Sequence, residues 1–300
     1  MQILKNQEVQ AIPSQKKVKV VQMGNITEIM YIEKLNMNGF PVKKLNKTEY
    51  MVVSTGEVLE YQNHAENRAQ NTDSLRKTFK KIRQLINTNF IGAKNELAFT
   101  ITYAQNMTDN KVLYKDFEKF IKRLRYKYLD IDYMSVVEPQ ERGAWHCHIL
   151  LRFNGLESIY IPNKDIEELW GHGFVKVKAI RSDVDNLGAY LSAYLGDVEL
   201  NRNTFKQLKP GVIVKEVEIQ GKTKKFIKGG RLHMYPNGMQ IYRCSSGIRK
   251  PKIDYMYYKD AKKVVGAGTP NYSSKIDILN DEGHKINSIT YEHYNLKRTT

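Results

Sequence analysis

The sequence predicts an α+β fold: an antiparallel β-sheet of about five strands with flanking helices, plus N- and C-terminal extensions. The first observation is the order of elements from residue 97 to residue 195, which reads strand, helix, two strands, helix, strand, helix. The second is the composition, since 41% apolar and 27% charged residues are ordinary for a folded protein. The third is the lack of an internal repeat, which argues against solenoids and propellers. We therefore expect a β-rich extension over residues 1–70, a central domain over 71–200 and a basic region over 201–300.

The first predicted elements are short strands and a basic helix. Residues 17–22 and 26–32 read as strands on either side of the turn formers Gly24 and Asn25. From Ser74, apolar residues recur at helical spacing, which predicts an amphipathic helix. The cations on its polar face are Arg76, Lys77, Lys80, Lys81 and Arg83.

A strand and a second basic helix come next. Residues 97–103 are rich in β-branched and aromatic side chains, which predicts a strand. The following helix turns five apolar residues inward, namely Leu113, Phe117, Phe120, Ile121 and Leu124. Its outward cations are Lys115, Lys119, Lys122, Arg123, Arg125 and Lys127.

The next two strands form a hairpin that carries candidate metal ligands. Residues 131–138 and 144–153 are predicted to pair across a short turn. Because side chains alternate along a strand, His146 and His148 point to one face of the sheet. Glu138 is expected directly across the ladder from His146, since both are equally distant from the centre of the turn. Two imidazoles and one carboxylate with open coordination positions describe a divalent-cation site that can also bind a phosphate oxygen.

A short helix and one more strand follow the hairpin. Residues 163–170 read as a helix with Asn163 as its N-cap. In residues 174–180, Lys176 and Lys178 alternate with valines, which predicts a strand that exposes two cations.

The last predicted helix of the central domain begins at Asp183 and ends at Gly196. Its buried stripe consists of Val184, Leu187, Leu191 and Leu195. Tyr190 and Tyr194 lie one turn apart beside this stripe, and Tyr190 is farther from the stripe's centre. A tyrosine beside a phosphate-binding metal site is a candidate nucleophile.

The C-terminal region and the net charge point to nucleic acid. After Asp197 the chain is rich in Lys and Gly, with strands expected near 212–219 and 224–227 and then a tail rich in Tyr and Lys. The chain carries 48 Lys and Arg against 32 Asp and Glu, a net charge of +16, and its 19 tyrosines suit exposed bases. A generically basic protein is the alternative that charge alone leaves open. Backbone contacts are also expected from Lys222, Lys224, Lys225, Lys228, Arg231 and residues 249–263.

Several classes of protein are disfavoured by the sequence. Two cysteines, Cys147 and Cys244, cannot form a disulfide framework, and no apolar run approaches the about 18 residues of a membrane span. We therefore expect a cytoplasmic protein with no membrane partner. The run Gly221, Lys222, Thr223 ends like a phosphate-binding loop, but position 216 holds Glu where that motif needs glycine, so no NTPase is predicted.

Taken in order, these motifs resemble the HUH endonucleases, and among them the rolling-circle replication initiators of plasmids and phages. That signature combines an early strand like residues 99–102, a His-hydrophobe-His strand and a helix with Tyr-x-x-x-Tyr. The histidine motif matches His146 and His148, the tyrosine motif matches Tyr190 and Tyr194, and Glu138 fits the carboxylate ligand of many members. The resemblance covers about residues 95–200. It departs at Ala193, where many relatives carry lysine, and leaves Lys176 or Lys178 to substitute.

The resemblance implies a fold, a reaction and partners. The palm would be RRM-like, within a nuclease domain over 71–200 that includes the preceding basic helix. Glu138, His146 and His148 would hold Mg²⁺ or Mn²⁺, and Tyr190 would attack single-stranded or cruciform origin DNA. The products would be a free 3′-OH and a 5′-phosphotyrosine link, with Tyr194 available for a second transfer. Without an NTPase of its own, such an initiator would use a host helicase.

Three alternatives remain open at this point. A conjugative relaxase would share the chemistry, although relaxases usually place the tyrosine before the histidines. A single-strand transposase shares this motif order, although the long segment before residue 95 does not suit so compact an enzyme. A non-catalytic nucleic-acid-binding protein could retain the sheet without the reaction.

Overall fold

The computed structural model describes residues 2–6, 11–35, 42–46, 48–61, 72–140, 142–180, 187–188, 198–199, 214–219, 222–227, 231–236, 238–266 and 268–298. Two compact units are found. Unit 1 comprises Met1–Gln22, Ile26–Glu66 and Lys252–Thr300, and unit 2 comprises Met23–Asn25 and Asn67–Pro251. This division differs from the predicted boundaries of 1–70, 71–200 and 201–300.

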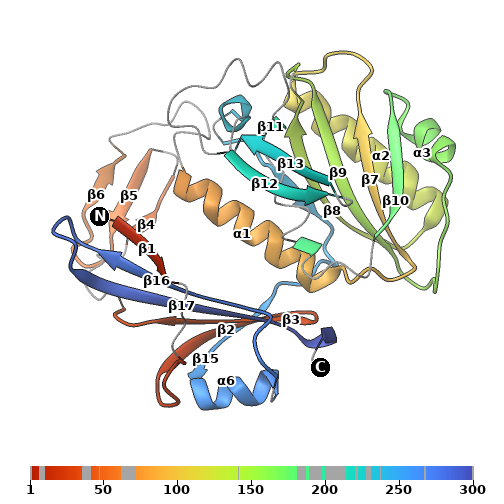
Figure 1. The fold of residues 1–300 in the computed structure, drawn as a ribbon. Coiled ribbons are helices and arrows are strands. Elements are labelled where there is room, and N and C mark those ends of the chain that lie inside the picture. Colours follow the sequence, from red (N-terminus) through yellow and green to blue (C-terminus); the bar gives the residue numbers. More distant parts are fainter. Residues whose placement is uncertain are drawn as a thin grey trace. The chain divides into compact units, whose positions relative to one another are not determined.

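Unit 2 is built on a five-stranded antiparallel sheet (Figure 1). In spatial order its strands are β10 (Val175–Ala179), β7 (Glu96–Thr102), β9 (Trp145–Phe153), β8 (Ile131–Pro139) and β14 (Tyr242–Cys244). The α+β fold with an antiparallel sheet of about five strands is confirmed. Four of these strands were predicted, whereas β14 comes from the segment expected to be a DNA-contacting extension.

Two helices cover opposite faces of this sheet. They are α1 (Thr72–Asn89) and α2 (Asn110–Tyr128), both predicted as basic amphipathic helices. In α2, the ring of Phe117 packs edge-on against Tyr133 of β8, with 5.5 Å between the ring centroids. Tyr133 is odd-numbered in β8, so it points to the face opposite Glu138. The end of α1 is bonded to the other face, the one that carries Glu138 and both histidines.

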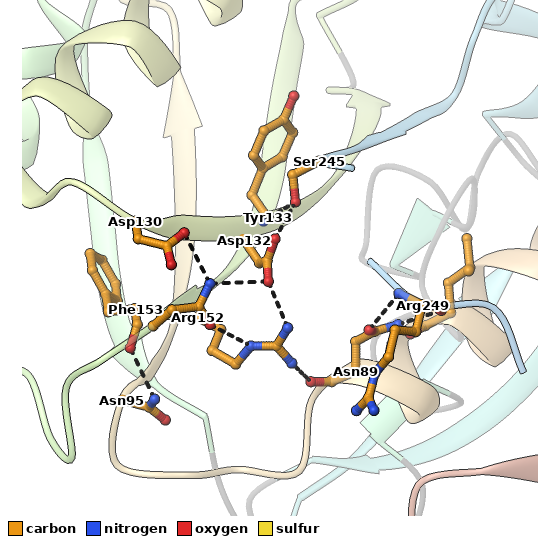
Figure 2. A network of polar contacts seen from close by, with 11 residues as sticks. Asn89, Asn95, Asp130, Asp132, Tyr133, Arg152, Phe153, Ser245 and Arg249 are labelled. Carbon is orange, nitrogen blue, oxygen red and sulfur yellow. Dashed lines mark hydrogen bonds and ion pairs between the residues drawn. The ribbon is translucent and has the colours of Figure 1, made fainter. Parts of the chain in front are cut away.

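That attachment of α1 is a network of buried polar groups, shown in Figure 2. The guanidinium of Arg152 in β9 donates to the Asp132 carboxylate in β8 at 2.7 Å and to the carbonyl oxygen of Asn89 at 2.9 Å. Asn89 is the last residue of α1, and its amide exchanges two hydrogen bonds of 2.8 Å with the backbone of Arg249. The Ser245 hydroxyl also donates to Asp132, at 2.9 Å. The network therefore joins α1, the central hairpin and the segment after β14.

Local sequence explains where the helices begin. The α2 helix starts at an N-cap, Asp109, whose carboxylate accepts from the backbone N–H groups of Lys111 at 2.7 Å and Val112 at 3.4 Å. The short helix α3 (Asn163–Trp170) was expected to be capped by Asn163, and this was wrong. Pro162 occupies the N-cap position, and the Asn163 side chain instead accepts from the backbone N–H of Val177 in β10. That bond attaches α3 to the edge of the sheet.

Smaller elements complete unit 2. A three-stranded sheet has the order β11 (Val198–Glu199), β13 (Lys222–Ile227) and β12 (Val214–Ile219), which confirms the strand pair predicted in this region. A short 3₁₀ helix, η2 (Leu232–Met234), precedes β14. The predicted positions Val184, Tyr190, Leu191, Ala193, Tyr194, Leu195 and Lys228 lie outside the described residues.

Unit 1 is formed by both ends of the chain. Its six-stranded sheet has the order β1 (Gln2–Asn6), β16 (Tyr272–Leu279), β17 (Lys285–Asn295), β3 (Ile26–Ile32), β2 (Lys17–Met23) and β15 (Lys252–Tyr257). Helix α6 (Tyr258–Val265) buries Ala261 and Val265 against Val18 and Val20 of β2. A second sheet contains β4 (Val42–Lys44), β5 (Glu49–Val52) and β6 (Val58–Glu60), and a 3₁₀ helix, η3 (Leu296–Arg298), follows β17.

The C-terminal residues are therefore not a simple basic tail, which corrects the predicted division. Strand β15 pairs with β2, and β17 pairs with β3, so residues after 251 complete a sheet that the N-terminal residues begin. Pairing between strands so distant in sequence leaves no local pattern to read. Among the described helices none is long and apolar enough to cross a membrane.

Candidate active site

The register of the central hairpin brings three candidate ligands to one face. Glu138 pairs directly with His146, as predicted from the turn. On its other side β9 pairs with β7, so that Thr102 lies opposite His146 and Thr100 lies opposite His148. Residues directly opposite each other in a ladder project to the same side of a sheet. These five side chains therefore share the face to which α1 is attached.

The ligand atoms converge in a small volume. The two histidine Nε2 atoms are 2.9 Å apart, and each lies 3.2 Å from Oε2 of Glu138. Three ligand atoms bound at right angles around a cation at about 2.1 Å would be about 3.0 Å apart. The residues thus fit a divalent cation held on one side by three protein ligands, with the remaining positions facing outward.

Exposure grades across the cluster. Side-chain exposure is 5% for Glu138, 11% for His146 and 43% for His148. The His148 Nδ1 atom is within 3.2 Å of the Thr100 hydroxyl, which fixes the ring with Nε2 directed at the cluster. The cluster is therefore closed at Glu138 and open to solvent on the His148 side, where a substrate could approach.

Burial favours the neutral form of His146. Burial is the largest influence and lowers the pKa of His146 below its ordinary value of 6.5, against the opposing effect of Glu138. Its Nδ1 atom is buried and finds no hydrogen-bond partner among the described residues, so a second proton there would gain nothing. A neutral imidazole is the form that binds a metal ion.

Arg231 is the site residue that sequence reasoning missed. It was expected to contact DNA backbone, but its Nη2 atom lies 2.6 Å from Oε1 of Glu138 and its Nη1 donates to the Pro139 carbonyl at 2.9 Å. The side chain is 17% exposed. Arg231 reaches Glu138 from the segment before η2, 92 residues away from Pro139 in sequence, so no spacing could have marked it.

The two oxygens of Glu138 thus have different partners. Oε1 faces Arg231, and Oε2 faces both histidines. Burial alone would raise the pKa of Glu138, but hydrogen bonds with His146 and His148 and the Arg231 charge outweigh it and lower the pKa to about 2. Glu138 is therefore ionised at neutral pH, with one oxygen held by Arg231 and the other directed at the cluster.

The predicted DNA-binding cations fall on both sides of the sheet. Lys176 lies opposite Thr100 in the β10–β7 ladder, hence beside His148, and Lys178 lies opposite Ala98, one position pair farther away. Both are exposed, as are Lys77 and Lys80 on α1. The cations on α2, which packs on the opposite face, are also exposed; they are Lys119, Lys122 and Arg123.

The segment predicted to carry the tyrosines is described only at Leu187 and Gly188. Both are helical and buried, which agrees with the predicted stripe at Leu187. The Gly188 N–H donates to Oδ1 of Asn87 in α1 at 2.7 Å. A Cβ atom at position 188 would lie 2.4 Å from the Arg83 carbonyl oxygen, so only glycine permits this close approach. The segment therefore meets α1 at Asn87, two residues before the bond between Asn89 and Arg152.

Comparison with known proteins adds one finding. Residues 96–199 match a family model for the replication-associated protein ORF2. The match covers β7, α2, both strands of the hairpin and the predicted tyrosine segment, and it supports a replication protein of the Rep type. No curated protein matches the sequence.

Proposed function

We propose that this protein is a rolling-circle replication initiator that nicks single-stranded or cruciform origin DNA by tyrosine transesterification and later rejoins strands. The observation that carries the proposal is the convergence of Glu138, His146 and His148 within the span that matches a replication-associated family. A Mg²⁺ or Mn²⁺ ion bound there would polarise the scissile phosphate and stabilise the charge that develops on it.

The protein's own groups have separate roles in this proposal. Glu138, His146 and His148 hold the cation, and Arg231 fixes the carboxylate without occupying the oxygen that faces the histidines. Lys176 takes the role of the lysine that relatives carry at the position of Ala193, because it lies across Thr100 from His148. A cation there would neutralise charge on the DNA next to the scissile phosphate.

Tyr190 is the proposed nucleophile. Its hydroxyl oxygen forms a bond to phosphorus while the bond from phosphorus to the 3′ oxygen breaks, and the phenolic proton ends on that 3′ oxygen. The products are a free 3′-OH and a 5′-phosphotyrosine link that preserves the energy of the broken bond. A second attack, by a 3′-OH or by Tyr194, would reverse or transfer this link.

Unwinding would come from elsewhere. The reaction conserves a phosphodiester and needs no nucleotide, and the sequence holds no complete phosphate-binding loop. We therefore propose that a host helicase opens the duplex after nicking, and that the free 3′-OH primes synthesis.

Labelled oligonucleotides test the proposal. Full-length protein, Mn²⁺ and single strands that tile the DNA flanking its gene should yield a protein adduct, stable in SDS, with 3′-labelled DNA. The same strand labelled at the 5′ end should instead be released as a shorter product. His148→Ala should remove both signals, whereas His172→Ala, an exposed histidine packed 4.9 Å from the Trp170 ring, should keep them.

Metal binding provides a readout separate from nicking. Electron paramagnetic resonance of Mn²⁺ should detect a bound ion in wild-type protein and in His172→Ala but not in His148→Ala. If wild-type protein binds DNA but forms no adduct on any strand, the protein is a non-catalytic DNA-binding protein. Equal Mn²⁺ binding by wild-type and His148→Ala proteins would contradict the ligand assignment.

A further inference from the structure

The outer face of the β2–β15 strand pair in unit 1 carries tyrosine rings among lysines. Strand β15 is the last strand of the six-stranded sheet, so this pair forms the sheet's edge. In the register, Tyr255 lies opposite Lys19 and Tyr257 lies opposite Lys17. The two tyrosines are 73% and 45% exposed. We call Tyr255, Tyr257, Lys17, Lys19 and Lys259 the edge surface.

Each ring of the edge surface has an ammonium group near it. The Nζ atom of Lys19 lies 5.8 Å from the centre of the Tyr255 ring. The Nζ atoms of Lys17 and Lys259 each lie 5.9 Å from the centre of the Tyr257 ring. These distances match those of cation–π pairs, which hold the lysines beside the ring faces. The surface therefore combines flat aromatic groups with concentrated positive charge.

The tyrosines are not needed for the core of unit 1. Side chains alternate along a strand, and the other face of β2 packs Val18 and Val20 into the core at 2% and 0% exposure. Asp254 lies between Ile253 and Tyr255, so it points to that other face, where its carboxylate is paired with Lys252 at 3.2 Å. The charge on the outer side of β15 is thus not neutralised by its own aspartate.

We propose that the edge surface binds single-stranded DNA, with bases stacked on Tyr255 and Tyr257 and phosphates beside the three lysines. Residues two apart on a strand are about 6.7 Å apart. That is roughly twice the 3.4 Å rise per nucleotide of a stacked strand, so each ring would receive one base of an extended strand. Paired bases hide their faces inside the duplex, so stacking of this kind selects single strands.

This inference rests on the proposed function, because an initiator that opens its origin exposes a single strand near the protein. It adds a contact outside the span that matches the replication-associated family, since every residue of the edge surface lies outside residues 96–199. The edge surface would hold the strand by its bases, whereas the residues of the candidate active site would act on one phosphate.

Binding of a fluorescent oligothymidine of about 16 nucleotides to the full chain, measured by anisotropy without divalent metal, tests the inference. The double variant Tyr255→Ala/Tyr257→Ala should raise the dissociation constant about tenfold or more, because two stacking contacts are lost. The variant Tyr255→Phe/Tyr257→Phe keeps the rings and should bind within about twofold of wild type. Tyr272→Ala, a 51% exposed tyrosine of β16 in the same sheet, should bind like wild type.

The outcomes separate this inference from the proposed function. An unchanged dissociation constant for the double alanine variant would overturn the edge surface, whether or not the protein nicks DNA. An equal loss for duplex DNA, or a phenylalanine variant as weak as the alanine variant, would also overturn it. If wild-type protein forms no adduct but the alanine variant still loses single-strand binding, the nicking proposal fails and the edge surface stands.

Discussion

At the scale of single residues, Glu138 is the residue on which the candidate site depends. Its carboxylate is nearly inaccessible to solvent and is shared between Arg231 and two histidines. Removing one partner of a buried ion pair usually costs more than forming the pair gains, because the remaining charge loses its compensation. Arg231 is therefore expected to matter for stability as well as for the placement of the carboxylate.

Arg231→Gln should lower the free energy of unfolding of unit 2 by about 1–3 kcal/mol at neutral pH. Both tryptophans, Trp145 and Trp170, are buried in unit 2, so their fluorescence in a urea titration reports on this unit. Lys127→Gln is the control, because its ion pair with Asp165 is 45% and 37% exposed and should be worth less than about 1 kcal/mol. Equal losses for the two variants would show that the contact between Arg231 and Glu138 does not stabilise the fold.

The residues of the site differ in how far sequence could predict them. Glu138 and His146 are eight positions apart around a short turn, so the period of a β-strand alone places them opposite each other. Thr100, also in a strand that was predicted, was not recognised as the partner of His148 because no turn or spacing in the sequence sets the register of β7 against β9. Arg231 could not be found, since a lone arginine in a basic chain carries no positional signal.

At the scale of elements, the network of Asp132, Arg152 and Asn89 fixes α1 to the sheet. Burial would raise the pKa of Asp132, but hydrogen bonds from Arg152, Asn154 and Ser245 outweigh it and lower the pKa below 3.8. A carboxyl group whose pKa is lower in the folded state stabilises the protein above its ordinary pKa. That contribution is lost as the pH falls through the folded-state value.

Asp132→Asn should therefore cost about 2–3 kcal/mol at about pH 7, and this difference should shrink as the pH falls below about 4. Tryptophan fluorescence in urea at both pH values measures it. A penalty that is the same at about pH 3 would mean that shape, and not charge, makes Asp132 important.

Gly188 provides a second prediction at this scale, because its backbone is pressed against α1. Gly188→Ala would place a methyl group 2.4 Å from the Arg83 carbonyl oxygen and would force the segment away from the helix. We expect the rate of DNA adduct formation to fall at least about tenfold. Mn²⁺ binding, which depends on the hairpin alone, should not change. A normal adduct rate would show that the contact with α1 does not position the nucleophile.

Elements also show where sequence reasoning ends. The hairpin, α1 and α2 each carry their own periodicity and were predicted close to their observed bounds. The cap of α3 was wrong because the Asn163 side chain bonds to a neighbouring strand, a tertiary contact that overrides the local preference. Strand β14 was missed because Tyr242, Arg243 and Cys244 alternate too briefly to give a signal, and only pairing with β8 defines them.

At the scale of the whole molecule, the charge of +16 predicts DNA binding that weakens steeply with salt. The sheet of unit 2 separates its cations into two sets, and only one shares the face of the histidines. Lys176→Gln/Lys178→Gln should reduce the slope of log K against log salt by about 1–2, because those lysines lie on that face. Lys119→Gln/Lys122→Gln, on α2, should leave the slope nearly unchanged. Equal effects of the two pairs would mean that DNA contacts both faces.

The arrangement of the chain in two units was beyond the reach of the sequence. The N-terminal strands were recognised, but their partners β15, β16 and β17 lie more than 200 residues later, in a region read as a basic tail. Long-range pairing depends on shape and register across the whole sheet, which no local window contains. The same pairing places Tyr255 and Tyr257 beside Lys17 and Lys19, so the edge surface is visible only in the structure.

Identification of the residue that becomes linked to DNA is the most direct test of the proposed chemistry. Full-length protein would be incubated with Mn²⁺ and an origin single strand, and the covalent peptide would be digested and sequenced by mass spectrometry. We predict a DNA-linked Tyr190 in wild-type protein, its loss in Tyr190→Phe and in His148→Ala, and its retention in Tyr194→Phe. A linkage found only on Tyr194 would reverse the roles of the two tyrosines, and a linkage on neither, or one that persists in His148→Ala, would contradict the proposed mechanism.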